Sequence, residues 1–583
     1  MSFVQRVLSL IGRKHRTESL LLIFLVLLGT ILEAMGLGSI FPLLTIISKP
    51  EIINDYPTIS DYLIRFSPGN FVFLSSFNLS DSIKILFSAL ILFFLLIGLK
   101  TFIQVILSWR RSCFVAKLKS YWMGEILNEY LYQPYIFHLK KNSANLIKNV
   151  ESSTIFSSVI GMSIVLLIEI FVFISFSIVL FIAEPIGFLV VFFTFLIAAY
   201  AFSYFSKKKM YLWGGEVYHN NIYALKHMQQ ALGGIKETKL LGKEEIFKKI
   251  YNFHNVKVAG LERNMDFFQT LPKLWLELLF VMLIIFLVVL FSLQGKSIIT
   301  ILPVMGIFAA AGFRLVPSVN RILTGLQYLS SMVPPVEIIY DEYLKIRRLR
   351  DITKKVAEPI EFKKSIKLEK IEFYYDSKLQ KVLSSINLEI SKGQIIGFFG
   401  ESGAGKSTLI EIIGGLLEPS SGSLKIDDAV INSSNLGAWQ RKIGYVPQNV
   451  YLLDDSIRKN IAFGLSKNEI EDDKIYDACR GANLYKFIDS LPQKLDTSVG
   501  ERGTQLSAGQ RQRIGIARTL YYDPEVIIFD EATNNLDTKN EEEILKLISS
   551  LKKDKTILMI SHRESAIKTC DFIYYLDSGR IKN

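Results

Sequence analysis

The chain has 583 residues, of which 50% are hydrophobic, 12% aromatic and 21% charged. A soluble chain of ordinary composition has about 25% charged residues and lacks long apolar runs. A disordered chain combines low hydrophobicity with high net charge. The composition therefore argues against one large soluble enzyme and against a disordered protein.

The net charge is +12, from 67 Lys and Arg against 55 Asp and Glu. A basic excess can serve nucleic acid, an anionic membrane surface or an anionic substrate. In an apolar chain, basic cytoplasmic loops of a membrane protein account for it, and we expect no nucleic-acid partner. The three cysteines, Cys113, Cys479 and Cys570, lack the spacing of a disulfide framework or a zinc site.

Residues 1–17 are expected to form an amphipathic helix at the membrane interface. The segment MSFVQRVLSLIGRKHR ends in a basic cluster and lacks a small-residue cleavage site. These features favour an interfacial helix over a cleaved signal peptide.

Residues 18–335 are predicted to form a transmembrane domain of six helices. Each apolar run is close to the ~20 residues that cross ~30 Å of hydrocarbon as a helix. Short turns at 183–185 and 294–296 predict two hairpins. The spans are expected near 20–47, 83–107, 159–182, 186–205, 274–293 and 298–323.

Basic residues gather at the amino terminus and in two long loops, 110–155 and 206–270. Cytoplasmic loops carry such an excess, so we expect both termini and both loops in the cytoplasm. The loops are too long for simple connections. We therefore expect the membrane helices to continue into the cytoplasm, with a short helix at the end of each pair.

The character changes after residue 335. Residues 336–360 read as a charged helical linker, and residues 361–583 as a soluble α/β domain. Its β-type runs IIGFFG, KIGYVPQ, VIIFD, TILMISH and FIYYLD alternate with helical segments. This alternation favours a mostly parallel sheet flanked by helices.

The segment GESGAGKS, residues 400–407, follows one predicted strand and precedes a predicted helix. This is the phosphate-binding GxxxxGK[ST] pattern in its required setting. Glycines let backbone N–H groups surround a phosphate, Lys406 supplies a positive charge to the β and γ oxygens, and the Ser407 hydroxyl suits Mg²⁺.

The segment VIIFDE, residues 526–531, is an apolar strand that ends in two carboxylates. We expect Asp530 to hold Mg²⁺ beside the phosphate loop. Glu531 would then face the terminal phosphate and polarise the attacking water.

The segment LSAGQ, residues 506–510, opens the predicted helix QRQRIGIARTL. Its hydroxyl, its free N–H groups and the positive end of the helix dipole suit an anion. With the two motifs above, the sequence resembles the ATP-binding cassette (ABC) family. The resemblance implies the exporter ABC fold, with ATP and Mg²⁺ as cofactors.

The resemblance extends to further motifs and gives their residues roles. Tyr375 matches the aromatic residue that stacks on adenine, Gln448 the Q-loop residue that senses Mg²⁺, and His562 the switch histidine. Residues 535–537 match the D-loop, and residues 499–503 resemble the X-loop of exporters. The nucleotide contacts it implies are Tyr375, Gly400, Glu401, Ser402, Gly403, Ala404, Gly405, Lys406, Ser407, Thr408, Ser507, Ala508, Gly509, Gln510 and Asp537. The catalytic set it implies is Glu531, His562 and Gln448, and the metal set is Ser407, Gln448 and Asp530.

One position departs from the family pattern, because Ala508 replaces a glycine of LSGGQ. Alanine is small, so we expect it to be tolerated. In this family the signature of one cassette closes over the phosphate loop of another. A chain with one cassette and six spans therefore implies a homodimer with two ATP sites.

Ionisable residues inside the spans are the best indication of cargo, because a charge in the bilayer is costly and usually functional. Arg314 and Arg321 lie seven residues apart, on roughly one helix face. They either form a basic stripe that guides a phosphate-type head group or pair with Glu33 and Glu277.

The membrane half resembles, more loosely, PglK-type lipid-linked oligosaccharide flippases in segments 36–48, 313–322 and 445–464. This resemblance implies a polyprenyl-pyrophosphate oligosaccharide as cargo and a bacterial inner membrane as location. The alternatives are an exporter of another amphipathic cargo (lipid, peptide or drug) and an ATP-gated channel or regulator.

Overall fold

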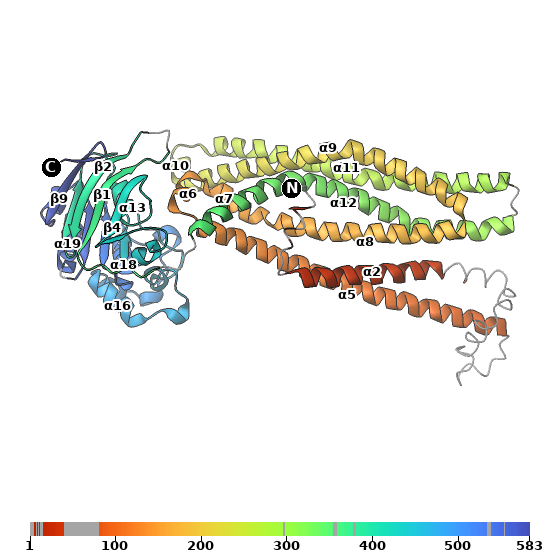
Figure 1. The fold of residues 1–583 in the computed structure, drawn as a ribbon, viewed down its shortest axis with the longest axis horizontal. Coiled ribbons are helices and arrows are strands. Elements are labelled where there is room, and N and C mark those ends of the chain that lie inside the picture. Colours follow the sequence, from red (N-terminus) through yellow and green to blue (C-terminus); the bar gives the residue numbers. More distant parts are fainter. Residues whose placement is uncertain are drawn as a thin grey trace. The chain divides into compact units, whose positions relative to one another are not determined.

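The computed structural model describes residues 5–6, 9, 11, 15–39, 43, 81–294, 298–353, 358–376, 380–532, 538–552 and 554–582. Its contacts divide the chain into two compact units (Figure 1). The membrane unit contains residues 1–132 and 141–347, and the soluble unit contains residues 133–140 and 348–583. Most of the expected interfacial helix, residues 51–80 and most of the predicted turn at 294–296 lie outside the described residues.

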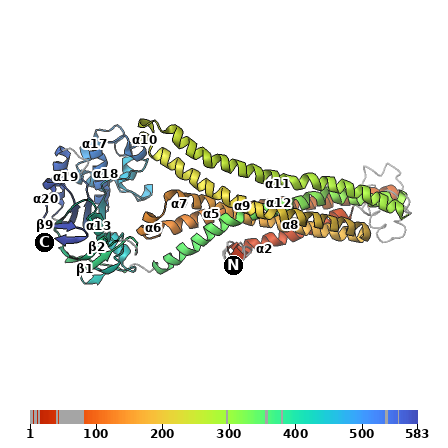
Figure 2. The same ribbon diagram turned by 90° about the horizontal axis from the view of Figure 1, so that it is seen from above.

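Long helices build the membrane unit, as Figure 2 shows. They are α2 (Arg16–Gly38), α5 (Asp81–Leu131), α7 (Ser143–Ser152), α8 (Thr154–Ala183), α9 (Pro185–Gly233), α11 (Glu244–Leu293) and α12 (Ile298–Thr353). Four of these have about 50 residues or more. At 1.5 Å per residue, such helices are more than twice as long as the ~30 Å hydrocarbon core of a bilayer is thick. Each of these four helices is therefore much longer than the span predicted on it.

Short helices stand at the ends of the extended helices, as predicted. The helix α6 (Tyr135–Lys140) separates α5 from α7, and α10 (Ile235–Leu240) separates α9 from α11. Pro134 lies in the first connection and Gly234 in the second, where its backbone φ of −103° ends α9. Proline disfavours helix at the preceding residue and glycine is a poor helix former, so both connections end a helix where the sequence breaks it.

Five helical segments in the described part of the chain are long and apolar enough to cross a membrane. They lie on α2, on α5, on α7 together with α8, on α9 and on α11. The sixth expected span, 298–323, lies on α12, which also carries Arg314, Pro317 and Arg321. The helix persists through Pro317, which neighbouring helices allow in a membrane bundle.

The helices α8, α9, α11 and α12 share one apolar core, whose fully buried members include Val172, Leu276, Leu287 and Ala311. The helix α2 packs against α5 and α8. The bundle therefore consists of a tightly packed set of four helices with the α2 and α5 pair beside α8.

A buried polar network joins the extended helices around Asn149 of α7. Tyr218 of α9 donates its hydroxyl to Asn149 Oδ1 (2.8 Å), and Asn149 Nδ2 donates to the Tyr130 hydroxyl (2.9 Å) and to Glu342 Oε2 (3.1 Å). Breaking one member would leave buried polar groups unsatisfied. The network therefore fixes α5, α7, α9 and α12 relative to one another.

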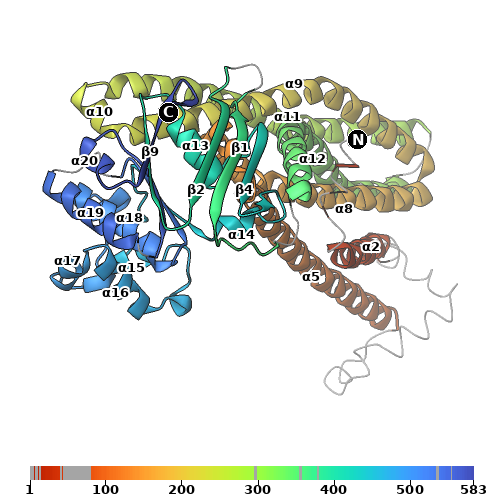
Figure 3. The same cartoon turned by 60° about the vertical axis from the view of Figure 1, so that its left-hand side comes forward.

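The soluble unit contains two sheets (Figure 3). The larger has the order β10-β9-β3-β8-β7-β6, with every pair parallel except β10 on β9. Its strands are β3 (Ile395–Phe399), β6 (Ile443–Val446), β7 (Val526–Asp530), β8 (Thr556–Ile560), β9 (Phe572–Asp577) and β10 (Arg580–Lys582). The five predicted β-type runs are all strands of this sheet, so the predicted mostly parallel sheet is confirmed.

The smaller sheet is antiparallel, in the order β2-β1-β4-β5. It contains β1 (Ser365–Phe373), β2 (Leu383–Ser391), β4 (Ser421–Ile426) and β5 (Ala429–Val430). The described helices of the soluble unit are α6, α13 (Lys406–Ile413), α14 (Leu436–Gln440), α15 (Ile457–Ile461), α16 (Asp472–Gly481), α17 (Tyr485–Asp489), α18 (Ala508–Tyr521), α19 (Thr538–Leu551) and α20 (Glu564–Ile567).

Candidate functional site

The phosphate loop lies between β3 and α13. All five residues of β3 are buried, which fixes the point from which the loop leaves the sheet. Gly400, Gly403 and Gly405 have φ values of 145°, 84° and 98°. A residue with a side chain rarely adopts these angles. The glycines are therefore required by the shape of the loop.

The side chain of Lys406 points back into this loop and is only 5% exposed. Its Nζ donates to the carbonyl oxygens of Gly400 (2.8 Å) and Glu401 (2.7 Å). Burial lowers the pKa of Lys406, and the charges of Glu531 and Asp530 oppose that shift. The ammonium group is thus held at the centre of the loop, where a phosphate would meet it.

Three of the predicted catalytic residues come together at the end of β7. Glu531 follows the strand with a φ of 51° and donates its backbone N–H to Ile560 O (3.1 Å). Gln448 Nε2 donates to Glu531 Oε2 (2.7 Å), and His562 Nε2 lies 3.1 Å from Glu531 Oε1. Two segments that are remote in sequence therefore orient one carboxylate, as a general base requires.

Asp530, the last residue of β7, is held by Tyr445, which has no predicted role. The Tyr445 hydroxyl donates to Asp530 Oδ2 (2.7 Å). Burial and the charge of Glu531 raise the pKa of Asp530, while the Tyr445 hydrogen bond and Lys406 lower it. Burial and the charge of Asp530 also raise the pKa of Glu411 on α13. Carboxylates crowded in this way favour a nearby cation.

Three more of the predicted nucleotide contacts are Tyr375, Ser407 and Asp537. The Tyr375 hydroxyl is 3.1 Å from Thr408 Oγ1, so this aromatic ring stands beside the first turn of α13. The hydroxyl of Ser407 lies on an exposed residue. Asp537 and the rest of the D-loop lie outside the described residues.

The signature segment caps α18. Ser507 Oγ accepts from Gln510 N (3.2 Å), and Gln510 Oε1 accepts from Ser507 N (2.8 Å), which makes a capping box. Ser507 and Ala508 are exposed and Gly509 is buried. Within the described residues, no hydrogen bond or ion pair joins this segment to the phosphate loop of the same chain. Ala508 is the first residue of α18 and has no positive φ, so its Cβ adds no backbone strain.

These residues fit a magnesium nucleotide. The glycine-rich loop leaves backbone N–H groups and a buried ammonium for phosphate oxygens. Asp530 and the exposed hydroxyl of Ser407 are the oxygen ligands that Mg²⁺ prefers. The crowding of Asp530, Glu531 and Glu411 is what a bound divalent cation would relieve.

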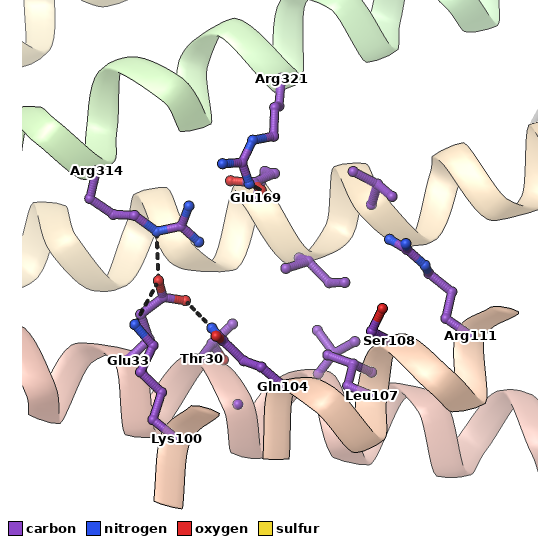
Figure 4. A pocket seen from close by; sticks show the side chains of 14 residues that line it. Thr30, Glu33, Lys100, Gln104, Leu107, Ser108, Arg111, Glu169, Arg314 and Arg321 are labelled. Carbon is purple, nitrogen blue, oxygen red and sulfur yellow. Dashed lines mark hydrogen bonds and ion pairs between the residues drawn. The ribbon is translucent and has the colours of Figure 1, made fainter. Parts of the chain in front are cut away.

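A second site is a cavity of about 600 Å³ in the membrane unit. Side chains of α2, α5, α8 and α12 line it, and Figure 4 shows Arg314 and Lys100 directed toward Glu33 and Arg321 directed toward Glu169. The lining residues are Val26, Gly29, Thr30, Glu33, Lys100, Gln104, Leu107, Ser108, Arg111, Val165, Ile168, Glu169, Arg314 and Arg321. Both arginines of the predicted basic stripe are among them.

Each arginine also pairs with a buried carboxylate. Arg314 Nε donates to Glu33 Oε1 (2.6 Å), and Arg321 Nη1 donates to Glu169 Oε1. Lys100 Nζ lies 3.4 Å from Glu33 Oε1. The two arginines therefore line the cavity and are also paired with carboxylates, so the two alternatives do not exclude each other. The partner of Arg321 is Glu169 rather than Glu277, and Glu169 was not among the predicted residues.

The soluble unit matches a known family. Residues 383–534 match the model described as "ABC transporter". A stretch of 217 residues is 41% identical to an "ATP-dependent lipid A-core flippase" of Coxiella burnetii and covers 37% of each chain. A stretch of 226 residues is 39% identical to a "Putative multidrug export ATP-binding/permease protein" of Staphylococcus aureus and covers 39% of each chain. The matched stretches thus span under two fifths of the curated relatives.

One solved structure matches nearly the whole chain. It is described as the structure of a bacterial Atm1-family ABC exporter with ATP bound. The match has a TM-score of 0.72 and 22% identity, and it covers 97% of this chain and 94% of that chain. At this identity the match shows the fold, which is the predicted combination of a helical transmembrane domain and an α/β nucleotide-binding domain.

Proposed function

Because this chain carries an ABC transporter domain on the fold of an ABC exporter, we propose that it is an ATP-driven exporter. Two copies would form a homodimer in a bacterial inner membrane, with the soluble unit and both termini in the cytoplasm. The cargo would be a lipid with a phosphate-type head group, and specifically a polyprenyl-pyrophosphate-linked oligosaccharide. The enzyme activity would be ATP hydrolysis coupled to translocation.

The chain's own residues supply the groups for hydrolysis. The N–H groups of the glycine-rich loop and Lys406 bind the phosphates, and Glu531 takes a proton from the attacking water. Gln448 donates to one carboxylate oxygen of Glu531, and His562 lies within hydrogen-bond distance of the other. Mg²⁺, when bound, neutralises charge on the phosphate oxygens. The carboxylate of Asp530 and the hydroxyl of Ser407 would hold it.

The exposed signature segment supports a dimer. Ser507 caps its helix from an exposed position, and it has no hydrogen bond to the phosphate loop of its own chain within the described residues. A helix N-terminus attracts a phosphate. The segment would therefore close over the nucleotide of a second copy, and this closure would move the extended helices.

The cavity is the observation that carries the cargo proposal. It is too polar for a purely apolar ligand, because four cations and two carboxylates line it: Lys100, Arg111, Arg314, Arg321, Glu33 and Glu169. Arginine binds phosphate oxygens through paired N–H groups. The basic excess therefore suits an anionic head group.

The direct test is transport in reconstituted vesicles. Fluorescent lipid-linked oligosaccharide should change leaflet only with ATP and the wild-type protein, and Arg314→Ala combined with Arg321→Ala should abolish the change. Glu531→Gln should abolish it as well. ATP turnover stimulated by a drug or by a peptide, without lipid flipping, would favour an exporter of another amphipathic cargo. Ion conductance that depends on ATP would favour the channel alternative.

A further inference from the structure

The two carboxylates of the cavity are far more buried than the cations they contact. The side chains of Glu33 and Glu169 are 4% and 3% exposed, whereas Arg314 and Arg321 are 25% and 47% exposed. The carboxylates therefore stand behind the arginines. The cations present their remaining surface to the cavity.

The hydrogen bonds show how firmly each carboxylate is held. Besides Arg314 and Lys100, Glu33 contacts Gln104, whose Nε2 lies 3.4 Å from Oε2 (Figure 4). Glu169 accepts from both Arg321 and the Ser318 hydroxyl. Each buried carboxylate is thus held by at least one cation and one neutral side chain at the wall of the cavity.

The contacts use only part of each guanidinium group. Arg314 contacts Glu33 through Nε, and Figure 4 draws no contact from its two terminal nitrogens. Arg321 contacts Glu169 through Nη1. A guanidinium has five N–H donors. Each arginine therefore retains donors for an oxyanion while a carboxylate stays on its other side.

The charges of the cavity do not cancel. Four cations against two carboxylates leave a formal charge of +2. Arg111 forms no ion pair with any residue that the structure describes. A head group with two negative charges, such as a pyrophosphate diester or a phosphate monoester, matches this excess.

We propose that Glu33 and Glu169 are built-in counter-anions that limit how tightly the cavity holds a doubly charged phosphate-type head group. The inference rests on the proposed function, because it concerns the cargo of that same cavity. A transporter must release what it binds. A cavity with four uncompensated cations would hold a diphosphate too tightly for rapid release.

Two opposite effects decide what removing a carboxylate does. Two unit charges about 6 Å apart change a binding constant by about tenfold at an effective dielectric constant of about 40. Loss of side-chain positioning would weaken binding by about two- to tenfold. In Glu33→Gln and Glu169→Gln the amide oxygen still accepts from the arginine, so most of the positioning is kept. The removal of the negative charge therefore outweighs the loss of positioning, and the head group binds more tightly.

The test measures head-group binding by the full-length protein in phosphatidylcholine nanodiscs. Every protein carries Lys406→Ala, so that the ATP site does not take up the probe. The probes are undecaprenyl pyrophosphate, inorganic pyrophosphate and uncharged undecaprenol. Glu277→Gln is the matched control, because Glu277 lies on α11 in a predicted span but does not line the cavity.

We expect Glu33→Gln and Glu169→Gln to bind undecaprenyl pyrophosphate about tenfold more tightly, with undecaprenol binding unchanged and Glu277→Gln equal to the parent. Tighter binding of inorganic pyrophosphate alone would also support counter-anions, with a soluble anion as the ligand. Unchanged or weaker binding in folded Glu33→Gln and Glu169→Gln proteins would overturn the proposal.

Transport separates this inference from the proposed function. In proteins with Lys406 intact, both glutamine variants should flip lipid at a lower maximal rate and reach half that rate at a lower lipid concentration. If Arg314→Ala combined with Arg321→Ala leaves pyrophosphate binding intact, the cargo proposal itself fails. If that double variant loses binding while neither glutamine variant tightens it, only the counter-anion inference fails.

Discussion

Replacing Gly400 with alanine tests whether the phosphate loop needs glycine for space as well as for backbone angle. Gly400 has a φ of 145°, and a Cβ there would lie 2.0 Å from the backbone oxygen of Leu576. Leu576 belongs to β9, the parallel neighbour of β3. The added carbon would therefore push the loop away from the sheet that positions it.

The magnitude follows from two costs. A left-handed or more extreme φ costs a residue with a side chain about 1–2 kcal/mol. Forcing a carbon more than 1 Å inside its normal contact distance adds about 1–3 kcal/mol through backbone shifts. We therefore expect Gly400→Ala to lower the free energy of unfolding of the soluble unit by about 2–5 kcal/mol.

Gly393 provides the matched control. Its φ is 82°, but nothing lies within 4 Å of a Cβ built there, and its N–H bond to Thr556 Oγ1 (2.9 Å) is kept in Gly393→Ala. That variant carries only the cost of the backbone angle, about 1–2 kcal/mol. Thermal unfolding and binding of a fluorescent ATP analogue by the detergent-solubilised protein compare the two. Equal unfolding temperatures for both variants would refute the steric argument.

Three further changes test other parts of the structure. Glu531→Gln should lower ATP turnover by about 100-fold or more, since it removes the base, and an ATP-bound dimer should accumulate on gel filtration; persistent phosphate release would remove Glu531 from the base role. Tyr445→Phe removes only the hydroxyl that donates to Asp530, so the Mg²⁺ concentration for half-maximal turnover should rise about three- to tenfold. No change in that concentration would show that the hydrogen bond has no effect on the metal site. Gly214→Ala should destabilise the bundle in thermal unfolding, because its Cβ would lie 1.9 Å from a backbone oxygen of α12, whereas Gly260→Ala, with nothing within 4 Å, should stabilise it by about 1 kcal/mol. Equal effects of the two alanines would contradict a close approach of α9 and α12.

The parts of the protein that the sequence predicts well are those with local signals. The phosphate loop is one contiguous segment between an apolar strand and a helix, so residues 400–407 define it without knowledge of the fold. The long helices also have local signals. Each has a contiguous apolar run, and Pro134 and Gly234 come soon after the ends of two of them. Both features are present in the structure.

The pairing of charges in the membrane could not be predicted in the same way. Arg321 pairs with Glu169, 152 residues earlier, because α8 packs beside α12. The sequence shows several carboxylates in the spans but not which helices are neighbours. The predicted partner Glu277 lies on α11 as an exposed residue.

Two features of the soluble unit were missed for different physical reasons. The antiparallel sheet begins with β1, whose buried residues Ile366 and Leu368 alternate regularly until an irregular register interrupts the pattern before Ile371. An extra residue of this kind shifts the later side chains to the other face and hides the period of two. Tyr445 lies within a predicted strand, but its hydrogen bond to Asp530 depends on how β6 and β7 lie side by side.

The short helix α6 has a consequence for swapping parts between transporters. It lies between two helices of the membrane unit along the chain, yet it groups with the soluble unit, and Ile136 packs against the apolar cluster that contains β1, β3 and α13. A hybrid protein joined only near residue 348 would take its cassette from another protein but would keep α6 from this chain. The contact between α6 and the cassette would then combine two sequences. A hybrid that carries residues 133–140 together with its own cassette keeps the contact native.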